Sequence, residues 1–504
     1  MTVEPCLLGN GERMERKAVP RLGVETFRNY VCEQVAAGRR LVALFGAPEP
    51  QATALYACLG DPGLGLIHIV STEVSDRYPS LTPDCPQAHW FEREIAEQWA
   101  VVPEGHPWLK PIRFHASHRS GHDAWGRDPA SIVVGDAAYY RVEGDEVHEV
   151  AVGPVHAGVI EPGHFRFQCH GETVFLLEIS LGYQHRGIER ALVGGPNPKC
   201  LSLAEAVAGD TTIGHASAYC QLIEALGGTE VVPRALALRG IALELERIAN
   251  HAGDLGALAG DVAYLPTAAF CGRLRGDFLN MTALACGSRF GRSWMRPGGV
   301  RGDLDDRMAA ELQQRLETSI RELAQAVALL WNTPSVLARF EGMGTVAPEV
   351  ASSLGLVGPA ARASGLECDV REEFPAGIYR FAQIPVSTWD TGDVFARAFV
   401  RWLEIQHSAA FLRKELRELP GGPAYRAPAS LRPDSIAVSL VEGWRGELCH
   451  VALTDAAGRF EHYKIIDPSF HNWIGLAMAL RGNPISEFPL CNKSFNLSYC
   501  GHDL

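Results

Sequence analysis

The pattern of hydrophobic and polar positions divides the chain into a β-rich first part and a longer second part dominated by helices. Near the start, the apolar runs 41–47 and 64–72 are bounded by turn residues and predict strands, and residues 89–101 predict a helix. Further along, segments 164–169 and 173–179 flank a short polar turn and predict a β-hairpin. We therefore expect a small α/β unit first and a hairpin at the start of the second part.

Two apolar stripes at helical spacing follow the hairpin. The first consists of Leu238, Ile241, Ala242, Leu245, Ile248, Ala249 and Ala252. The second consists of Leu304, Met308, Leu312, Leu316, Ile320, Leu323, Val327 and Leu330. Residues that recur every three or four positions share one face of a helix, and such a face packs against another element, so a helical core is expected. β-like runs return from about residue 432, before a last apolar helix at 473–480.

A polar stretch at 117–131 separates the two parts and is interpreted as a linker. The predicted organisation is a domain at 1–116, a linker at 117–145 and a second domain at 146–504. The expected fold class is α+β, with a small α/β domain followed by a domain that has a helical core and a flanking β-sheet.

Net charge and cysteine spacing narrow the possible functions. The 504 residues include 46 basic and 59 acidic side chains, a net charge of −13, which argues against nucleic acid as the main partner because phosphate binding needs a basic face. Thirteen cysteines are present, but the nearest pair is Cys491 and Cys500, so no CxxC spacing supports a zinc ribbon or an iron–sulfur cluster. We expect no signal peptide, no transmembrane segment and reduced thiols.

The first part carries a recognisable motif at 90–110. An acidic–basic–acidic triplet, Glu92 to Glu94, is followed by a glycine–histidine–proline sequence at 105–107. This segment resembles the signature of the C-type hydrophilic subunit of NADH:quinone oxidoreductase (complex I). The resemblance implies that domain 1–116 has the fold of that subunit.

The second part carries eight further segments in a family's order. They lie at 153–167, 181–192, 244–256, 296–304, 358–371, 392–404, 445–455 and 467–473. These segments resemble the D-type subunit of complex I and the large subunit of membrane-bound group 4 NiFe hydrogenases. The fusion of C-type and D-type parts is most similar to formate hydrogenlyase-type and hydrogenase-4-type complexes. The resemblance implies a hydrogenase-large-subunit-like domain with a helical core.

The resemblance also shows what is missing. NiFe hydrogenases hold nickel and iron with four cysteine thiolates from two CxxC pairs, since soft anionic sulfur suits these metals. The matching positions are occupied by Ala208, Thr211, Ser469 and Asn472. Alanine cannot bind a metal, and neutral hydroxyl and amide groups are poor nickel ligands. We expect no NiFe centre, no metal bound by this chain and no hydrogenase activity of its own.

In the complex I relatives, the resemblance implies that the former metal cavity holds a quinone headgroup between a hairpin-loop histidine and a tyrosine. An aspartate pairs with the histidine, and quinone reduction takes up two protons there. The aspartate corresponds to Asp261 and the histidine to His156 or His164, so these three are candidate proton-coupling residues. The tyrosine position holds Gly209, which has no hydroxyl. Alternatively, His164 is an ordinary strand histidine and Asp261 a helix-end carboxylate paired with an arginine.

The leading functional hypothesis is a metal-free, hydrogenase-like subunit of a membrane-associated, energy-converting oxidoreductase. It would house a quinone-type or vestigial cavity and help to couple electron transfer to ion translocation. The alternative is a non-redox structural subunit that links a membrane ion transporter to a soluble module. An active hydrogenase is disfavoured by the four substitutions. A free-standing enzyme is disfavoured because no nucleophile elbow, phosphate loop or dinucleotide fingerprint is found, and direct NAD binding is not expected.

The resemblance also implies cofactors, partners and a location. No cofactor is expected to be bound directly, although a quinone is possible, and iron–sulfur clusters are expected in a partner subunit. The expected partners are an iron–sulfur small subunit and antiporter-like membrane subunits. The chain is expected to lie peripherally on the cytoplasmic side of the inner membrane.

Overall fold

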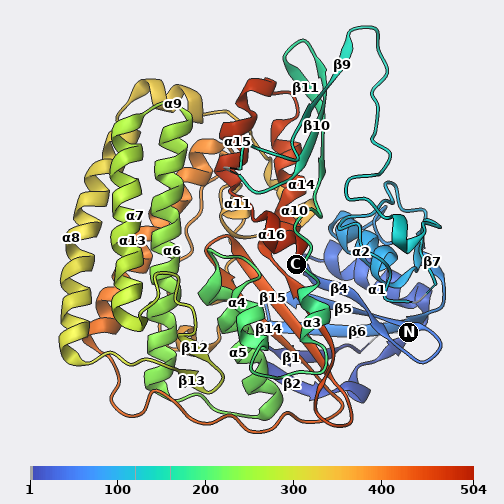
Figure 1. Ribbon diagram of the computed structural model, residues 1–504, viewed down its shortest axis with the longest axis horizontal. Helices are drawn as coiled ribbons and strands as arrows, with labels where there is room; N and C mark the ends of the chain where they lie inside the picture. The colour runs from blue at the N-terminus through green and yellow to red at the C-terminus, as the bar shows by residue number, and fades with distance from the viewer. Residues whose placement is uncertain (1–3, 120, 159) are drawn as a thin grey trace.

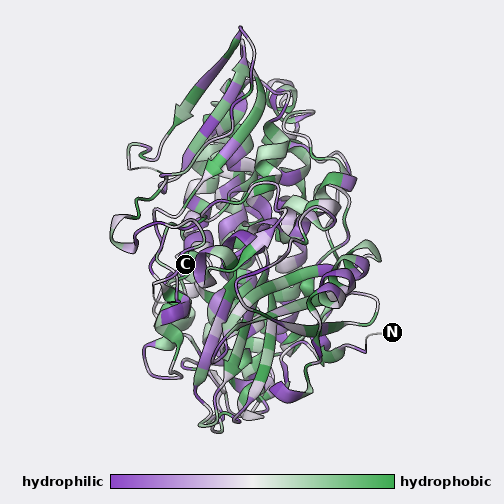
Figure 2. Ribbon diagram, turned by 90° about the vertical axis from the view of Figure 1, so that its right-hand side faces the viewer, coloured by the Kyte–Doolittle hydropathy of each residue, from purple (hydrophilic) through white to green (hydrophobic). Residues whose placement is uncertain are grey.

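A computed structural model describes residues 4–119, 121–158 and 160–504. Figure 1 shows an N-terminal module on one side, a bundle of long helices on the other, and the C-terminal strands and helices between them. A small β-sheet projects from one end of the molecule (Figures 1 and 2). The expected α+β class is confirmed.

The N-terminal module is built around one sheet. Its strands, in spatial order, are β1 (Cys6–Gly9), β6 (Leu66–Val74), β5 (Thr53–Asp61) and β4 (Arg40–Pro48), with β3 (Arg21–Leu22) also paired to β6. Helix α1 (Val24–Ala36) packs on β6 and β5, and α2 (His89–Trp99) packs on β4. The predicted strands correspond to β4 and β6 and the predicted helix to α2. Strand β5, whose nine residues are all buried, was not predicted.

The N-terminal residues also join the second module. Strand β2 (Glu12–Glu15) pairs antiparallel with β14 (Ser435–Gly443) and completes the sheet β16-β15-β14-β2. Beside it, the buried Asn10 side chain donates to the carbonyl oxygens of Phe374 and Leu440, at 2.7 and 3.0 Å. Residues 6–15 therefore contribute to both sheets.

Two larger sheets belong to the second module. One consists of β14, β15 (Gly446–Thr454) and β16 (Phe460–Ile466), together with β2. The other, which projects from the end of the molecule, has the order β11-β10-β9, with β9 (Val147–Val152), β10 (His164–His170) and β11 (Thr173–Ser180). Strands β10 and β11 form the predicted hairpin, and β9 pairs with the other edge of β10.

Four long helices form the bundle: α6 (Pro233–Asp261), α7 (Leu265–Cys286), α8 (Asp306–Trp331) and α13 (Val394–Arg417). Helix α6 packs against α7 and α13, and α8 packs against α7 (Figure 1). The two predicted apolar stripes lie on α6 and α8. Helix α8 exposes its polar face, whereas α6 buries charged residues as well as apolar ones along most of its length.

The remaining elements are short. The helices are α3 (Ile188–Leu192), α4 (Cys200–Glu205), α5 (Thr212–Gly227), α9 (Pro334–Phe340), α10 (Pro348–Leu354), α11 (Gly358–Arg362), α12 (Val370–Glu373), α14 (Pro468–Leu480), α15 (Phe488–Phe495) and α16 (Tyr499–Asp503). The strands are β7 (Arg77–Pro79), β8 (Val102–Glu104), β12 (Met295–Arg296) and β13 (Gly299–Val300). Among the described residues, none of the helices combines the length and apolar character needed to cross a membrane. All thirteen cysteines are free thiols.

Candidate functional site

A cavity of about 240 Å³ lies where the loop between β9 and β10 meets the end of α6 and helix α15. Its apolar walls are Val152, Ile160, Phe165, Phe488, Pro489 and Leu497. Its polar lining is His156, Asp261, Asn492, Lys493, Asn496 and Tyr499. A cavity that combines apolar walls with converging polar groups is the usual form of a small-molecule site.

His156 lies on the loop that borders the cavity. Its Nε2 is 2.9 Å from the carbonyl oxygen of Gly163. A carbonyl accepts hydrogen bonds only, so Nε2 carries a hydrogen and Nδ1 of the neutral ring is an acceptor. Gly153 makes this geometry possible, because its φ is 86° and an added Cβ would lie 2.1 Å from the Gly163 oxygen and 2.7 Å from the His156 ring. Only a glycine at position 153 therefore leaves room for His156 to lie in this position beside the cavity.

Asp261 is the last residue of α6 and lies at the rim of the cavity. Partial desolvation raises the pKa of its carboxyl, and the nearby Lys493 ammonium opposes this rise. The C-terminal end of a helix also disfavours a carboxylate, because the helix dipole is negative there. The charged neighbour in the cavity is thus a lysine and not the arginine considered from the sequence.

His164 opens strand β10 and is not among the described residues that line the cavity. Its Nδ1 lies 3.3 Å from the carbonyl oxygen of Gly153, and its ring packs edge-on against Tyr139. Burial lowers the pKa of this histidine. Of the two histidines that the sequence left open, the structure therefore brings only His156 together with Asp261.

Tyr499 is a cavity residue that the sequence analysis missed. Its hydroxyl accepts a hydrogen bond from Asn492 Nδ2 at 3.4 Å, and its ring packs against Trp473 with centroids 4.8 Å apart. Burial raises the pKa of the phenol to about 12. The residue belongs to the last helix of the chain, far in sequence from Asp261, so only the fold reveals that a tyrosine lines this cavity.

The four residues that the resemblance matches to hydrogenase thiolates are all buried. Ala208 and Thr211 precede α5, and Ser469 and Asn472 lie in the first turn of α14. The Asn472 amide accepts from the backbone N–H of Val357 and donates to its carbonyl oxygen, both at 3.0 Å. The Ser469 hydroxyl accepts from the backbone N–H of Ser498 at 2.8 Å. These polar groups thus bind the protein's own backbone.

A guanidinium group lies beside these positions. Arg445, in the turn between β14 and β15, forms an ion pair with Asp210 through two hydrogen bonds of 2.6 and 2.8 Å. It also donates to the Thr211 hydroxyl at 3.3 Å and to the backbone oxygen of Asn496 at 2.6 Å. Burial alone would raise the pKa of Asp210, but Arg445 outweighs it and the pKa is lowered. Because Asn496 lines the cavity, Arg445 joins the former ligand loop to the cavity wall.

His215 links the two former ligand segments. Its Nε2 lies 3.1 Å from Asp467 Oδ2, and its Nδ1 lies 3.1 Å from His450 Nε2. His450 Nδ1 in turn lies 2.9 Å from the Tyr463 hydroxyl. Asp467 also caps α14 by accepting from the Ser469 N–H at 2.8 Å. This buried chain of hydrogen bonds fixes α5 against the start of α14 and satisfies both nitrogens of His215.

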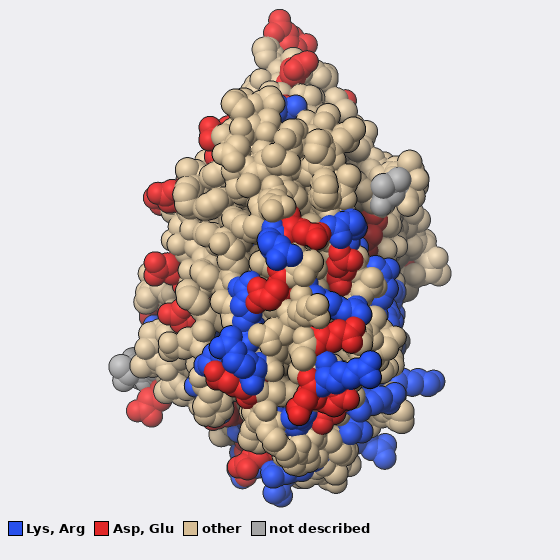
Figure 3. Space-filling model, turned by 90° about the vertical axis from the view of Figure 1, so that its left-hand side faces the viewer, with Lys and Arg blue, Asp and Glu red and all other residues tan. Residues whose placement is uncertain are grey.

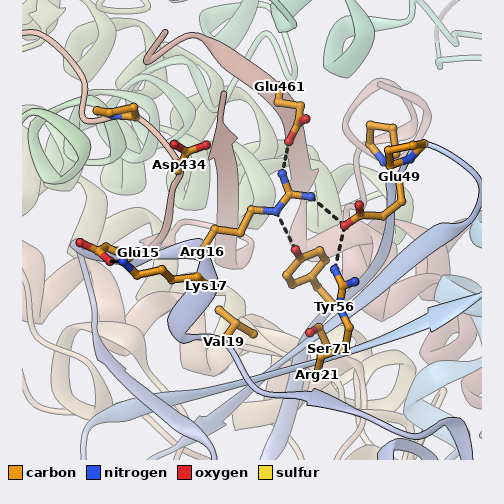
Figure 4. Close-up of a pocket in the computed structure, with 13 residues that line it drawn as sticks. Glu15, Arg16, Lys17, Val19, Arg21, Glu49, Tyr56, Ser71, Asp434 and Glu461 are labelled. Atoms are coloured by element: carbon orange, nitrogen blue, oxygen red, sulfur yellow. Dashed lines mark hydrogen bonds and ion pairs between the residues drawn. The ribbon is translucent and has the colours of Figure 1, made fainter. Parts of the chain in front are cut away.

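A larger, solvent-open hollow of about 990 Å³ lies between the N-terminal module and the second module. Figure 4 shows Arg16 at its centre, where the guanidinium contacts Tyr56, Glu49 and Glu461. Arg21 pairs with the same Glu49 carboxylate at 2.8 Å. These charged groups neutralise one another, so this hollow is better described as an ion-paired junction of the two modules than as a ligand site.

Comparisons with known proteins agree with this architecture. Residues 261–435 match the family described as respiratory-chain NADH dehydrogenase, 49 kDa subunit, and residues 40–126 match the 30 kDa subunit family. The carbon monoxide-induced hydrogenase of Rhodospirillum rubrum is 32% identical over 353 residues, which cover 69% of this chain and 97% of the relative. The chain belongs to the family of complex I 49 kDa subunits and the related hydrogenase large subunits.

Other members of this family show the same relationship. The NADH-quinone oxidoreductase subunit 4 of Thermus thermophilus is 28% identical over 369 residues, covering 68% of this chain and 90% of the relative. Hydrogenase-4 component G of Escherichia coli is 28% identical over 476 residues, covering 91% of this chain and 83% of the relative. The resemblance inferred from the motifs, including the fusion of two complex I-type parts, is confirmed.

The residues at the family's metal positions do not fit a NiFe centre. Ala208 has no donor atom, both polar atoms of Asn472 are committed to Val357, and the Arg445 cation beside Thr211 would repel a metal ion. Within the described part of the chain, no group of three or more His, Cys, Asp or Glu side chains is placed to hold a metal. That no NiFe centre forms stays a prediction.

Proposed function

We propose that the chain is a metal-free, hydrogenase-like subunit of a membrane-associated, complex I-like energy-converting oxidoreductase. The cavity at the end of α6 takes a quinone headgroup. The observation that supports this best is the meeting of His156 and Asp261 in one cavity, which also holds the Tyr499 phenol and the Lys493 ammonium. At about 240 Å³ the cavity suits a single ring, with an isoprenoid tail left outside.

The cavity residues suit the chemistry of quinone reduction. A quinone takes up two electrons and two protons, and its two carbonyl groups become hydroxyls. The electrons come from a reduced iron–sulfur cluster of a partner small subunit. Lys493 and Tyr499 line the cavity as hydrogen-bond donors for a quinone oxygen, and Asp261 lines it as a further proton-exchanging group.

The surface near the cavity suits contact with membrane subunits. Residues 262–272 and 323–338 lie at the same end of the bundle as Asp261. Neither stretch contains Asp, Glu, Lys or Arg. Leu265, Phe270 and Leu329 in these stretches are 67, 52 and 46% exposed. Figure 3 shows this contrast, because charged residues crowd the lower half of the bundle face and are sparse in the upper half. We propose that this uncharged end faces antiporter-like membrane subunits on the cytoplasmic side of the inner membrane.

Substitution of an exposed apolar residue tests this orientation. Phe270→Glu should leave the chain folded but reduce its recovery in the membrane fraction several-fold. Phe381→Glu is the matched control, since Phe381 is 76% exposed and follows the residues that pack at the other end of α6. Equal losses for both variants would contradict the proposed orientation.

A second candidate function is a non-redox coupling subunit. Gly209 favours it, because the family's tyrosine hydroxyl is missing at this position. The Tyr499 phenol in the cavity favours the redox function instead. The two functions differ in whether the cavity accepts a quinone.

Photolabelling of the purified complex with a short-chain azidoquinone separates the two functions. The redox function predicts labelled peptides from the loop at 153–163 and from α15, with loss of labelling when unlabelled quinone is added in excess. Absence of competable labelling in these segments would support the non-redox subunit. Nickel analysis of the same sample should find no stoichiometric metal, and stoichiometric nickel would refute the metal-free assignment.

A further inference from the structure

Helix α15 carries much of the polar lining of the cavity, and Asn496 forms its C-terminal cap. Asn496 follows the helix with φ 47° and ψ 52°, a left-handed conformation that asparagine adopts more readily than most residues. Its N–H donates to the Asn492 carbonyl oxygen at 3.0 Å and closes the last turn. Asn492 and Lys493, both in this turn, line the cavity together with Asn496. The cap therefore helps to set where the cavity lining lies.

Two buried arginines hold this end of α15. Arg445 Nε donates to the Asn496 carbonyl oxygen at 2.6 Å, and Arg401 donates to the Phe495 carbonyl oxygen at 3.2 Å. The last carbonyl groups of a helix have no partner within it, so these guanidinium groups supply the missing donors and complement the negative end of the helix dipole. Because Arg401 belongs to α13 and Arg445 to the turn between β14 and β15, the cap is anchored to two other elements.

The Asn496 side chain is held in one orientation. Its Nδ2 donates to Asp254 Oδ1 at 2.5 Å, and its Oδ1 accepts from Lys493 Nζ at 3.4 Å. A carboxylate only accepts hydrogen bonds and an ammonium only donates them, so the reversed amide would lose both contacts. Asp254 is buried on α6 and forms a 2.8 Å ion pair with Arg401, which fixes the carboxylate in turn.

The amide oxygen restricts where the Lys493 ammonium lies. Lysine has a long side chain with many rotamers, and ordering it costs conformational entropy. The contact with Asn496 keeps Lys493 among the residues of the cavity wall, which also include Asp261. An ammonium has three N–H donors, so one hydrogen bond to Asn496 leaves others for a ligand in the cavity.

We propose that Asn496 is a positioning residue of the quinone site. Its amide, oriented by Asp254, holds the Lys493 ammonium at the cavity wall, where the ammonium donates a hydrogen bond to a quinone oxygen. Asn496 acts through Lys493 and not by its own contact with the quinone. A donor that is already ordered binds a ligand more tightly than one that must be ordered when the ligand arrives. This inference rests on the proposed quinone function.

The Asn496→Gly variant of the purified complex tests the proposal. Glycine keeps the left-handed backbone without strain, but it has no amide to hold Lys493. The iron–sulfur clusters of the complex are reduced, and their reoxidation is followed over a range of decylubiquinone concentrations. The half-saturating quinone concentration should rise about tenfold, as expected when a hydrogen bond to a charged group is lost, while the limiting rate changes little.

A second variant separates positioning from capping of the helix. Asn496→Ala also lacks the amide, but alanine strains the left-handed backbone. Thermal melting should show that this complex is less stable than the Asn496→Gly complex. Both variants should nevertheless show the same rise in the half-saturating quinone concentration. A rise that occurs only in the less stable variant would overturn the positioning role.

The Lys493→Met variant tests whether Asn496 acts through the ammonium. Alone, it should raise the half-saturating quinone concentration about tenfold. Adding Asn496→Gly should cause no further rise, because two residues that act as one unit do not have additive effects on free energy. Effects that multiply in the double variant would show that Asn496 acts independently of Lys493, which would overturn the proposal.

The matched control is Asp434→Gly. Asp434 is also a polar residue in the left-handed conformation, with φ 46°, but it precedes β14 and is not among the described residues that line the cavity. Its quinone kinetics should equal those of the wild type. Unchanged kinetics in both Asn496 variants would overturn the positioning role and leave the quinone function standing. A wild-type complex that decylubiquinone does not reoxidise would overturn the quinone function and this inference with it.

Discussion

Arg445 and Asp210 form a two-point ion pair, with hydrogen bonds of 2.6 and 2.8 Å, beside the loop in which hydrogenases carry two metal ligands. Arg445 also contacts Thr211 at one of the former ligand positions and the backbone of Asn496 at the cavity wall. The loop is therefore held by an ion pair inside the protein.

Removing the cation should destabilise the chain. Arg445→Met leaves the Asp210 carboxylate without its partner and should lower the free energy of unfolding by about 3 kcal/mol. This is the low end for a broken buried pair, because the Asp210 side chain is 34% exposed. Urea unfolding measures the change. The double variant Arg445→Met/Asp210→Asn should lose less than the single variant, and an equal or larger loss would contradict the pairing.

The Arg445–Asp210 ion pair also predicts how the stability of the chain depends on pH. Despite burial, Arg445 lowers the pKa of Asp210, and His215 and Arg445 lower that of Asp467. A carboxyl whose pKa is lower in the folded than in the unfolded chain stabilises the fold at any pH above its unfolded-state pKa, which is about 3.9 for aspartate. This stabilisation is lost as the pH falls towards the folded-state pKa. Melting temperatures measured from pH 7 to pH 3 should drop below about pH 4. The Asp210→Asn variant should show a smaller drop in melting temperature below about pH 4. A drop equal to that of the wild type would show that Asp210 does not contribute to it.

Asn472 should be a structural residue at its former ligand position. Asn472→Ala leaves the buried N–H and carbonyl groups of Val357 without their partners, each worth about 1–3 kcal/mol. The expected loss of unfolding free energy is about 2–4 kcal/mol. Ser335→Ala on the uncharged start of α9 serves as a control and should change little. An Asn472→Ala chain as stable as the wild type would show that these hydrogen bonds are weak.

The chain should tolerate the family's tyrosine at position 209. A Cβ added to Gly209 would meet no atom within 4 Å, and its φ is not in the left-handed range. Gly209→Tyr should therefore alter the free energy of unfolding by no more than about 0.5 kcal/mol. Gly358→Ala is the contrasting change, because its φ is 64° and the new Cβ would lie 2.2 Å from the Arg445 carbonyl oxygen. Severe destabilisation by Gly209→Tyr would show that the loop has no room for a side chain at residue 209.

Local patterns predicted much of the fold. The hairpin at 164–179 and the helices that carry the apolar stripes were found because their periodicity is a property of neighbouring residues. Strand β5 was missed between two recognised strands, although its residues are as buried as those of β4. The pairing of β2 with β14 was also missed, because it joins residues at opposite ends of the chain.

The site was only partly predictable. His156 and Asp261 were identified through motifs, and the fold brings them to one cavity. Tyr499 and Glu404, whose carboxylate lies 2.9 Å from His251, were not identified, since each contacts residues far away in the sequence. The stripe on α6 correctly indicated a buried face but gave no sign that His251 on the same helix is buried too. Counter-charges from α13 make that burial possible, and helical periodicity does not report them.

The most direct test of the proposed function is quinone-dependent reoxidation of the iron–sulfur clusters in the purified, reduced complex. The rate is followed with decylubiquinone for the wild type, for Asp261→Asn and for the control Asp277→Asn, an exposed carboxylate that pairs with Arg273 on α7. We predict rapid reoxidation in the wild type and the control and a loss of about tenfold or more in Asp261→Asn. Equal rates in all three proteins, or no reoxidation by quinone in the wild type, would contradict a quinone site at the end of α6.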